Sequence, residues 1–281
     1  MRLGGPVAAT YASPEEWVGL LEAEGYRAAY CPVDVDAPDQ LVDEYFAAAS
    51  EAEIVVAEVG AWSNLLAADA DEAARALDLC RRSLALAERL GARCCVNVTG
   101  SLGSFWCGPD PRNRSAEALE RIVETVQAVV DDVRPSRTFF TLETSPWNYP
   151  YDVASYRELL VAVDRDAVAV HFDPVNLISS IDAYFATDRL IGEFVDAFGA
   201  AIRSCHAKDI RLSEEAYTVR LEECEPGTGN LDYSVYLSEL ARLDDDIPLM
   251  LEHLPSSASY RRAAEFIRGL AASEAAEVAN A

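Results

Sequence analysis

Acidic and imidazole side chains recur in four successive apolar segments of the second half of the chain. The segments span 138–145, 167–175, 202–210 and 247–254, and they carry Glu143, Asp173, His206 and Glu252. Carboxylates that converge would repel one another, and a divalent cation is the simplest way to stabilise them. Three carboxylates and one imidazole suit Mn²⁺, Mg²⁺, Co²⁺ or Zn²⁺. The residue types therefore predict a site for one divalent metal.

The alternation of side chains along a strand adds neighbours to these residues. Residues two apart share a face of a strand, so His171 projects with Asp173, and Lys208 projects with His206. His253 adjoins Glu252 and is expected to turn the other way unless the strand has ended. All three histidines of the chain and its only lysine fall in this set.

A closed parallel barrel would bring such residues together. Short apolar segments alternate with longer amphipathic ones along the chain. Eight strands, each followed by a helix, predict a single (β/α)₈ TIM barrel of the α/β class, in which reacting groups lie where strands end. The length of 281 residues fits one such domain over 1–281, with a tail after about 271 that is expected to fray. No glycine-rich phosphate fingerprint follows the first strand, which disfavours a dinucleotide-binding fold.

The remaining elements follow from periodicity and helix-start signals. Ser13-Pro14, Pro38-Asp39 and Ser115 are predicted to precede helices. The other four strands are expected at 6–11, 26–33, 53–62 and 94–100, and helices at 15–24, 40–51, 71–90, 116–133, 153–163, 181–199, 233–243 and 257–271.

Composition excludes several classes of partner. The formal net charge of −25 repels phosphate backbones, so no nucleic acid partner is expected. No stretch approaches the ~20 apolar residues of a membrane span, and no signal peptide is predicted, so a cytoplasmic location and no membrane partner are expected. Seven cysteines without a C-x-x-C pair indicate reduced thiols rather than a disulfide framework.

Several motifs together resemble the sugar phosphate isomerase/epimerase group of the xylose isomerase-like superfamily. They span about residues 53–270 and read EVGAWSN (58–64), LETSP (142–146), HFDPVN (171–176), CHAKD (205–209), PGTGNLDY (226–233) and LEH (251–253). The resemblance implies that Glu143, Asp173, His206 and Glu252 hold the metal. It also implies that Glu143 and Glu252 remove and return a proton on opposite faces of the substrate. Asn176 stands where ketose 3-epimerases often have a histidine. Relatives of this kind are often dimers or tetramers, so a homo-oligomer is an alternative to a monomer.

The implied activity is isomerisation or epimerisation of a small sugar or sugar-like hydroxy-ketone through a metal-stabilised enediolate. Loss of a β-hydroxyl from the same intermediate would instead make a dehydratase or lyase acting on an inosose or keto acid. A non-catalytic sugar-binding barrel is a further alternative. A phosphodiesterase with a histidine-rich metal cluster is disfavoured by three histidines and the negative charge.

Five residues are predicted to contact the substrate: His171, Lys208, Asn176, Trp62 and Glu58. Lys208 could hold a substrate group, or pair with Asp209 or a metal-ligating carboxylate. His171 could bind substrate or orient a carboxylate through a hydrogen bond. The loop 101–114 is long enough to act as a lid, and the segment 226–233 is interpreted as structural.

Overall fold

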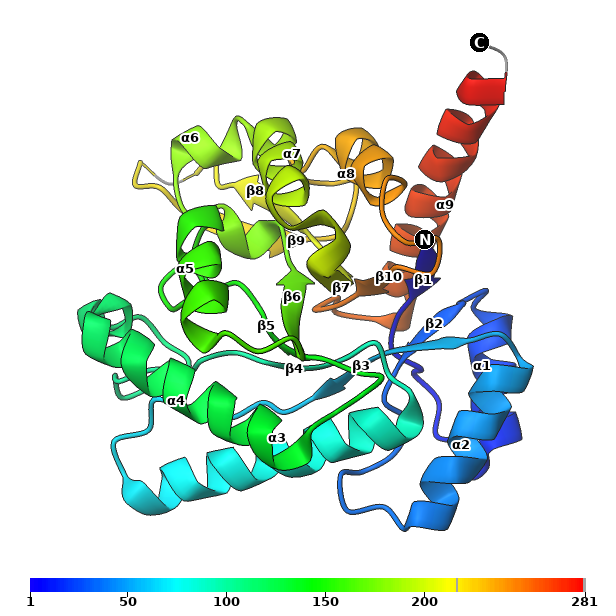
Figure 1. Cartoon of the computed structure of the whole chain (residues 1–281). Helices are drawn as coiled ribbons and strands as arrows, with labels where there is room; N and C mark the ends of the chain where they lie inside the picture. Colours follow the sequence, from blue (N-terminus) through cyan, green and yellow to red (C-terminus); the bar gives the residue numbers. More distant parts are fainter. Residues whose placement is uncertain (216, 280–281) are drawn as a thin grey trace.

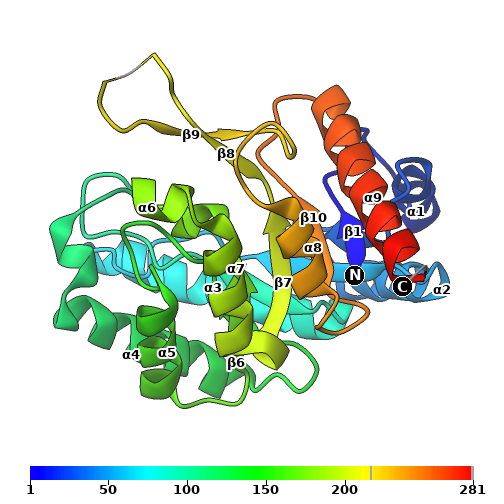
Figure 2. The same cartoon turned by 90° about the horizontal axis from the view of Figure 1, so that it is seen from above.

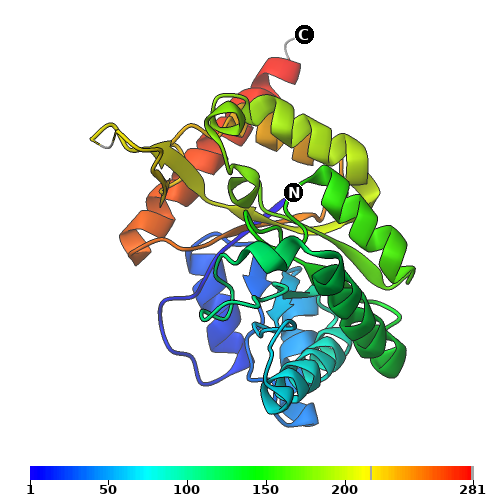
Figure 3. The same cartoon turned by 90° about the vertical axis from the view of Figure 1, so that its left-hand side faces the viewer.

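The computed structural model describes residues 1–215 and 217–279, with side chains described as far as residue 273. Eight parallel strands close into a barrel in the order β1-β10-β7-β6-β5-β4-β3-β2. The helices lie outside this ring of strands, as Figures 1 and 3 show. The predicted (β/α)₈ TIM barrel is confirmed. The barrel strands are β1 (Arg2–Gly4), β2 (Ala28–Tyr30), β3 (Val55–Gly60), β4 (Cys94–Asn97), β5 (Phe140–Leu142), β6 (Val168–Phe172), β7 (Ile202–Ala207) and β10 (Pro248–Leu251).

The helices begin where the sequence signals predict. Ser13 and Ser115 cap the first turns of α1 and α4 by accepting hydrogen bonds from the backbone N–H groups of Glu16 and Ala118. The helices are α1 (Pro14–Ala23), α2 (Asp39–Glu51), α3 (Ala70–Leu90), α4 (Ala116–Val133), α5 (Val153–Val163), α6 (Ile181–Tyr184), α7 (Thr187–Phe198), α8 (Tyr233–Leu240) and α9 (Ser257–Ala279). The segment 181–199, predicted as one helix, is two, and α9 continues beyond the predicted end at 271 to Ala279.

The prediction for the first strand is wrong. Residues 6–11 form no strand, and β1 is the short segment Arg2–Gly4, which pairs with β10 and β2. A Cβ atom on Gly4 would lie only 2.4 Å from the Ala28 carbonyl oxygen and 2.6 Å from Met250 Sδ. Glycine therefore permits the close approach of β1 to its neighbours. A strand of only three residues that includes a glycine has no pattern of apolar residues by which it could be predicted.

The predicted strand 202–210 ends earlier, at Ala207, and the chain continues into a hairpin that the sequence analysis missed. Strands β8 (Asp209–Leu212) and β9 (Leu221–Cys224) pair antiparallel. Figure 2 shows this hairpin reaching outward from the ring of helices and strands. It follows β7 directly, so it stands at the edge of the barrel where the chemistry-bearing residues lie.

Two further findings bear on the sequence predictions. All seven cysteines are free thiols, as expected. Within 1–215 and 217–279, the helices are too short or too polar to cross a bilayer.

Candidate metal centre and barrel-mouth pocket

Four side chains converge at the carboxyl ends of the late strands. Glu143, Asp173 and Glu252 each follow the last residue of β5, β6 and β10, and His206 is the penultimate residue of β7. One potential ligand atom of each residue lies within 4.8 Å of the others. His206 Nδ1 is 3.3 Å from Glu143 Oε1, 3.5 Å from Asp173 Oδ2 and 3.1 Å from Glu252 Oε1. We call these four residues the rim cluster.

The rim cluster has the excess of acidic groups that a cation would offset. Among the described residues, His206 Nδ1, Asp173 Oδ2 and Glu252 Oε1 are buried and make no hydrogen bond of favourable geometry. Asp173 Oδ2 and Glu252 Oε1 lie 2.7 and 2.6 Å from the Lys208 ammonium, so one ammonium and one imidazole offset three converging carboxylates and leave negative charge for a further cation. Carboxylate oxygens and one imidazole nitrogen are suitable donors for a divalent ion. The residues present therefore fit a divalent metal.

A second polar group lies beneath the rim cluster, inside the barrel. Glu58 on β3 accepts from both histidines: its Oε2 is 2.9 Å from His171 Nε2, and its Oε1 is 3.1 Å from His206 Nε2. All three side chains are buried. We call Glu58, His171 and His206 the inner triad. Because Glu58 holds Nε2 of His206, it leaves Nδ1 of the same ring turned toward the rim carboxylates.

Lys208 supplies the positive charge nearest the rim cluster. Its Nζ is 2.7 Å from Asp173 Oδ2, 2.6 Å from Glu252 Oε1 and 3.4 Å from Glu223 Oε1. Of the pairings considered from the sequence, the structure has the one with the carboxylates that are predicted to hold the metal. Asp209 instead accepts hydrogen bonds from the backbone N–H groups of Gly227, Gly229 and Leu231.

Tyrosine hydroxyls fix the backbone at the strand ends. Tyr156 donates to the Leu142 carbonyl, one residue before Glu143, over 2.6 Å. The same oxygen accepts from the backbone N–H of His171. Tyr236, Tyr233 and Tyr30 donate to the carbonyls of His206, Lys208 and Leu251. These bonds hold each strand end, and the functional side chain on it, in place.

Burial and charge shift the rim carboxyls in opposite directions in the metal-free protein. Burial raises the pKa of Glu143 above its ordinary value. Burial also acts to raise the pKa of Glu252, but the neighbouring His206 and Lys208 cations outweigh it and lower that pKa to about 2. Burial opposes the charged form of Lys208, yet Asp173 and Glu252 raise its pKa well above the ordinary value. Two similar carboxyls in unlike surroundings are typical of sites that move protons.

A pocket of about 850 Å³ opens above the rim cluster. Glu143, Glu252 and Lys208 are among the polar residues of its lining, and Asn176 Nδ2 donates to Glu143 Oε1 over 2.7 Å. Aromatic side chains form much of the rest: Trp62, Phe105, Trp106 and Trp147. Each of these four is more than a third exposed. A few polar groups at one end of an apolar cavity is the usual design of a small-molecule site.

The structure separates the five predicted substrate contacts into two sets. Lys208, Asn176 and Trp62 line the pocket. Glu58 and His171 do not line it and belong to the inner triad, where each contacts the other. Of the two roles predicted for His171, binding substrate or orienting a carboxylate, the structure has the hydrogen bond to a carboxylate.

Sequence reasoning missed several residues around the pocket. Glu223 lies on β9, accepts from His253 Nδ1 over 2.9 Å and approaches Lys208. Apolar and polar residues alternate over 219–222, ahead of a glycine-rich turn, and this pattern was the sequence signal for a strand that carries Glu223. Phe105, Trp106 and Trp147 lie in the loops directly after β4 and β5, where three large aromatic residues in polar surroundings were the available signal. The alternation does not apply to His253, because β10 ends at Leu251. Its side chain is well exposed, lines the pocket and places Nε2 3.8 Å from Glu252 Oε2.

Comparison with known proteins agrees with this architecture. A family model described as "Xylose isomerase-like TIM barrel" matches residues 19–270. No curated protein matches the sequence.

Three solved structures illustrate the similarity in fold. D-psicose 3-epimerase with D-tagatose from Clostridium cellulolyticum H10 is 15% identical, with a TM-score of 0.68 over 96% of this chain and 99% of that one. A xylose isomerase-like TIM barrel protein from Mycobacterium smegmatis in complex with magnesium is 16% identical, with a TM-score of 0.63 over 92% and 89%. The probable 3-DHS dehydratase AsbF from Bacillus anthracis is 13% identical, with a TM-score of 0.68 over 96% and 98%. At these identities the likeness shows the fold alone.

Proposed function

The chain belongs to the xylose isomerase-like TIM-barrel family, and we propose that it is a divalent-metal-dependent isomerase or epimerase of a small sugar or sugar-like hydroxy-ketone. The observation that carries the proposal is the rim cluster, in which Glu143, Asp173, His206 and Glu252 bring one ligand atom each within 4.8 Å at the floor of an open pocket.

Glu143 and Glu252 are suited to move the proton. Both carboxylates line the pocket, and β6 and β7 separate their strands in the barrel, so they reach the pocket from different directions. One carboxylate removes the proton from the carbon beside the substrate carbonyl, and the other returns a proton. Return to the opposite face of the same carbon is epimerisation, and return to the neighbouring carbon is isomerisation.

The other residues of the site position these groups. A bound divalent metal would polarise the substrate carbonyl and stabilise negative charge on its oxygens. Asn176 orients Glu143 through its hydrogen bond to Oε1. Lys208, held by Asp173 and Glu252, can direct an N–H toward a substrate hydroxyl from the pocket wall. Glu58 fixes the ring of His206 from below.

The first experiment is elemental analysis of natively purified wild type beside His206→Ala and a matched control, His253→Ala. Wild type and the control should carry about one equivalent of Mn, Mg, Co or Zn, and His206→Ala should carry much less. Wild type that neither carries nor takes up a divalent ion contradicts the proposal.

The second experiment is solvent-deuterium uptake into ketoses and inososes, followed by NMR. Uptake at carbon that is lost in Glu252→Gln supports proton transfer by this pair. A product lighter by one water would instead indicate the dehydratase alternative, in which the same carbanion expels a β-hydroxyl. Tight sugar binding without uptake in wild type would indicate a non-catalytic binding barrel.

A further inference from the structure

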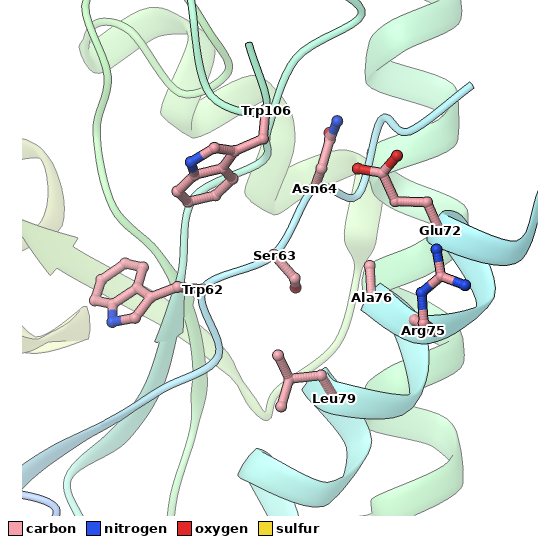
Figure 4. Close-up of a pocket in the computed structure, with 8 residues that line it drawn as sticks. All are labelled: Trp62, Ser63, Asn64, Glu72, Arg75, Ala76, Leu79 and Trp106. Atoms are coloured by element: carbon pink, nitrogen blue, oxygen red, sulfur yellow. The ribbon is translucent and has the colours of Figure 1, made fainter. Parts of the chain in front are cut away.

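The barrel-mouth pocket meets a second pocket at its aromatic wall. Trp62 and Trp106 line the barrel-mouth pocket, and they also line a side pocket of about 370 Å³ beside α3. Figure 4 shows the two indoles on one side of the side pocket and Glu72 and Arg75 on the opposite side, on α3. The two indoles therefore stand between the pocket above the rim cluster and the charged side chains of Glu72 and Arg75, and a ligand that extends across them would contact both.

Arg75 differs from the other arginines of α3. Arg81, Arg82 and Arg89 each form an ion pair with an aspartate. Arg75 has no ion pair or side-chain hydrogen bond to another described residue, in a chain with a net charge of −25. The Glu72 carboxylate, one helical turn away, is likewise uncommitted. Two unpaired hydrogen-bonding groups beside exposed indoles are suited to bind hydroxyl groups.

The wall shared by the two pockets is held in place. A Cβ on Gly60 would lie 2.4 Å from Trp62 Nε1, so the glycine makes room for the indole to fold back over the end of β3. Asn64, beside Trp62, is pinned by two hydrogen bonds to Ser101: its Nδ2 donates to the Ser101 carbonyl, and its Oδ1 accepts from the Ser101 N–H. The loops after β3 and β4 are therefore tied together around the side pocket, which favours a built site over an incidental hollow.

Size and charge define the ligand that would fill both pockets. The larger pocket is near the top of the range of roughly 300–1,000 Å³ that holds drug-sized ligands, so a six-carbon sugar at the rim cluster leaves much of it empty. Its described lining contains Glu143, Glu223, Glu252 and Lys208 but no arginine. The side pocket carries one charge of each sign. Neither pocket has a surplus of positive charge for a phosphate, and both are suited to a neutral ligand rich in hydroxyls.

We propose that the substrate is a neutral glycoside of two sugar-sized units, with one unit at the rim cluster and the other against Trp62, Trp106, Glu72 and Arg75. This inference rests on the proposed function for its first unit. The second unit lies with its apolar face on the indoles and its hydroxyls toward the side chains of α3. The side pocket thereby selects disaccharide-sized substrates over free or phosphorylated monosaccharides.

Calorimetric titration of the natively purified protein tests this inference without relying on turnover. The probes are maltose, cellobiose, lactose and sucrose, each compared with its own constituent monosaccharides. At least one disaccharide should bind about tenfold or more tightly than either of its units. Arg75→Ala should bring that ratio close to one and leave monosaccharide affinity unchanged. Arg82→Ala, on the same helix but away from the pocket, is the matched control and should keep the wild-type ratio.

Two results would overturn the inference. One is a wild type that binds no disaccharide more tightly than its units. The other is an equal loss of the ratio in Arg75→Ala and Arg82→Ala. Failure here is distinguishable from failure of the proposed function. Metal binding and deuterium uptake on monosaccharides with no disaccharide preference would refute only the side pocket. A disaccharide preference in a protein without a metal or proton exchange would refute only the proposed chemistry.

Discussion

The rim cluster and the inner triad share His206 but differ in how the charge of their carboxylates is balanced. In the inner triad each oxygen of Glu58 has one imidazole partner, and the group is sealed from solvent. In the rim cluster three carboxylates share one imidazole and the ammonium of Lys208, and the carboxylates of Glu143 and Glu252 face a pocket. Both groups have the residue types of a metal site.

This difference teaches that residue type alone does not identify a metal centre. A buried carboxylate between two imidazoles is already stabilised by them, so an added cation would compete with existing bonds. Three carboxylates that share one imidazole and one ammonium keep an excess of negative charge, which a cation from outside would offset. We therefore assign positioning to the inner triad and ligand binding to the rim cluster, and the following predictions test that division.

The largest effect is expected from Glu143→Gln. The amide cannot accept the substrate proton, so deuterium exchange into substrate should fall by about 10²–10⁴-fold. The free energy of unfolding measured in urea should stay the same or rise, because one of three mutually repelling carboxylates is gone. A variant that is strongly destabilised would place Glu143 with the structural residues instead.

Glu58→Gln should have the opposite profile. Removing the charge leaves His171 and His206 without their anionic partner, and breaking a buried pair in this way costs about 3–5 kcal/mol of folding free energy. Chemical denaturation of Glu58→Gln beside Glu143→Gln gives the comparison directly. Equal stability of the two variants would contradict the division into two groups.

Metal should stabilise the folded protein through the rim cluster only. At a metal concentration 100 times the Kd, the expected gain is about 2.7 kcal/mol, seen as a higher Tm that a chelator reverses. Asp173→Asn should lose most of this shift, whereas His171→Gln, at a lower starting stability, should keep it. A shift that disappears in His171→Gln and persists in Asp173→Asn would reverse the assignment.

The smallest effect is expected from Tyr156→Phe, which touches both groups. The hydroxyl donates to the Leu142 carbonyl beside the rim cluster and accepts from the His171 N–H of the inner triad. Its loss should cost about 1–2 kcal/mol of folding free energy, because the ring still packs on Phe194 and Phe198. Thermal denaturation measures the cost, and no change would show that these hydroxyl bonds do not hold the strand ends.

The sequence contained most of the information needed for the barrel. Alternation of apolar segments with amphipathic ones located seven of the eight barrel strands, because period-two and period-3.6 patterns report burial directly. It failed at Arg2–Gly4, where the strand depends on a glycine packed against neighbouring backbone. It also failed after Ala207, where the chain stays extended from β7 into β8 and only its hydrogen-bond partner changes.

The candidate site was less completely predictable. Strand ends and the shared face of His171 and Asp173 could be inferred from local spacing. The contact of Glu58 with both histidines joins strands on different sides of the barrel, and no local pattern encodes it. A register irregularity between Val170 and His171 also changes which residues face one another across β6 and β7. The predicted roles of the site residues stay predictions until metal and substrate are measured.

The way the β8–β9 hairpin is attached has a consequence for the evolution of this protein. Asp209 closes the base of the hairpin by accepting the backbone N–H groups of Gly227, Gly229 and Leu231, and Glu223 on β9 contacts His253, so the hairpin is fastened to the barrel near its base. Insertions or deletions between 213 and 220 can then accumulate without displacing Lys208 or the residues of the rim cluster. The hairpin is thus a replaceable module, through which the lining of the barrel-mouth pocket can change while the rim cluster stays in place.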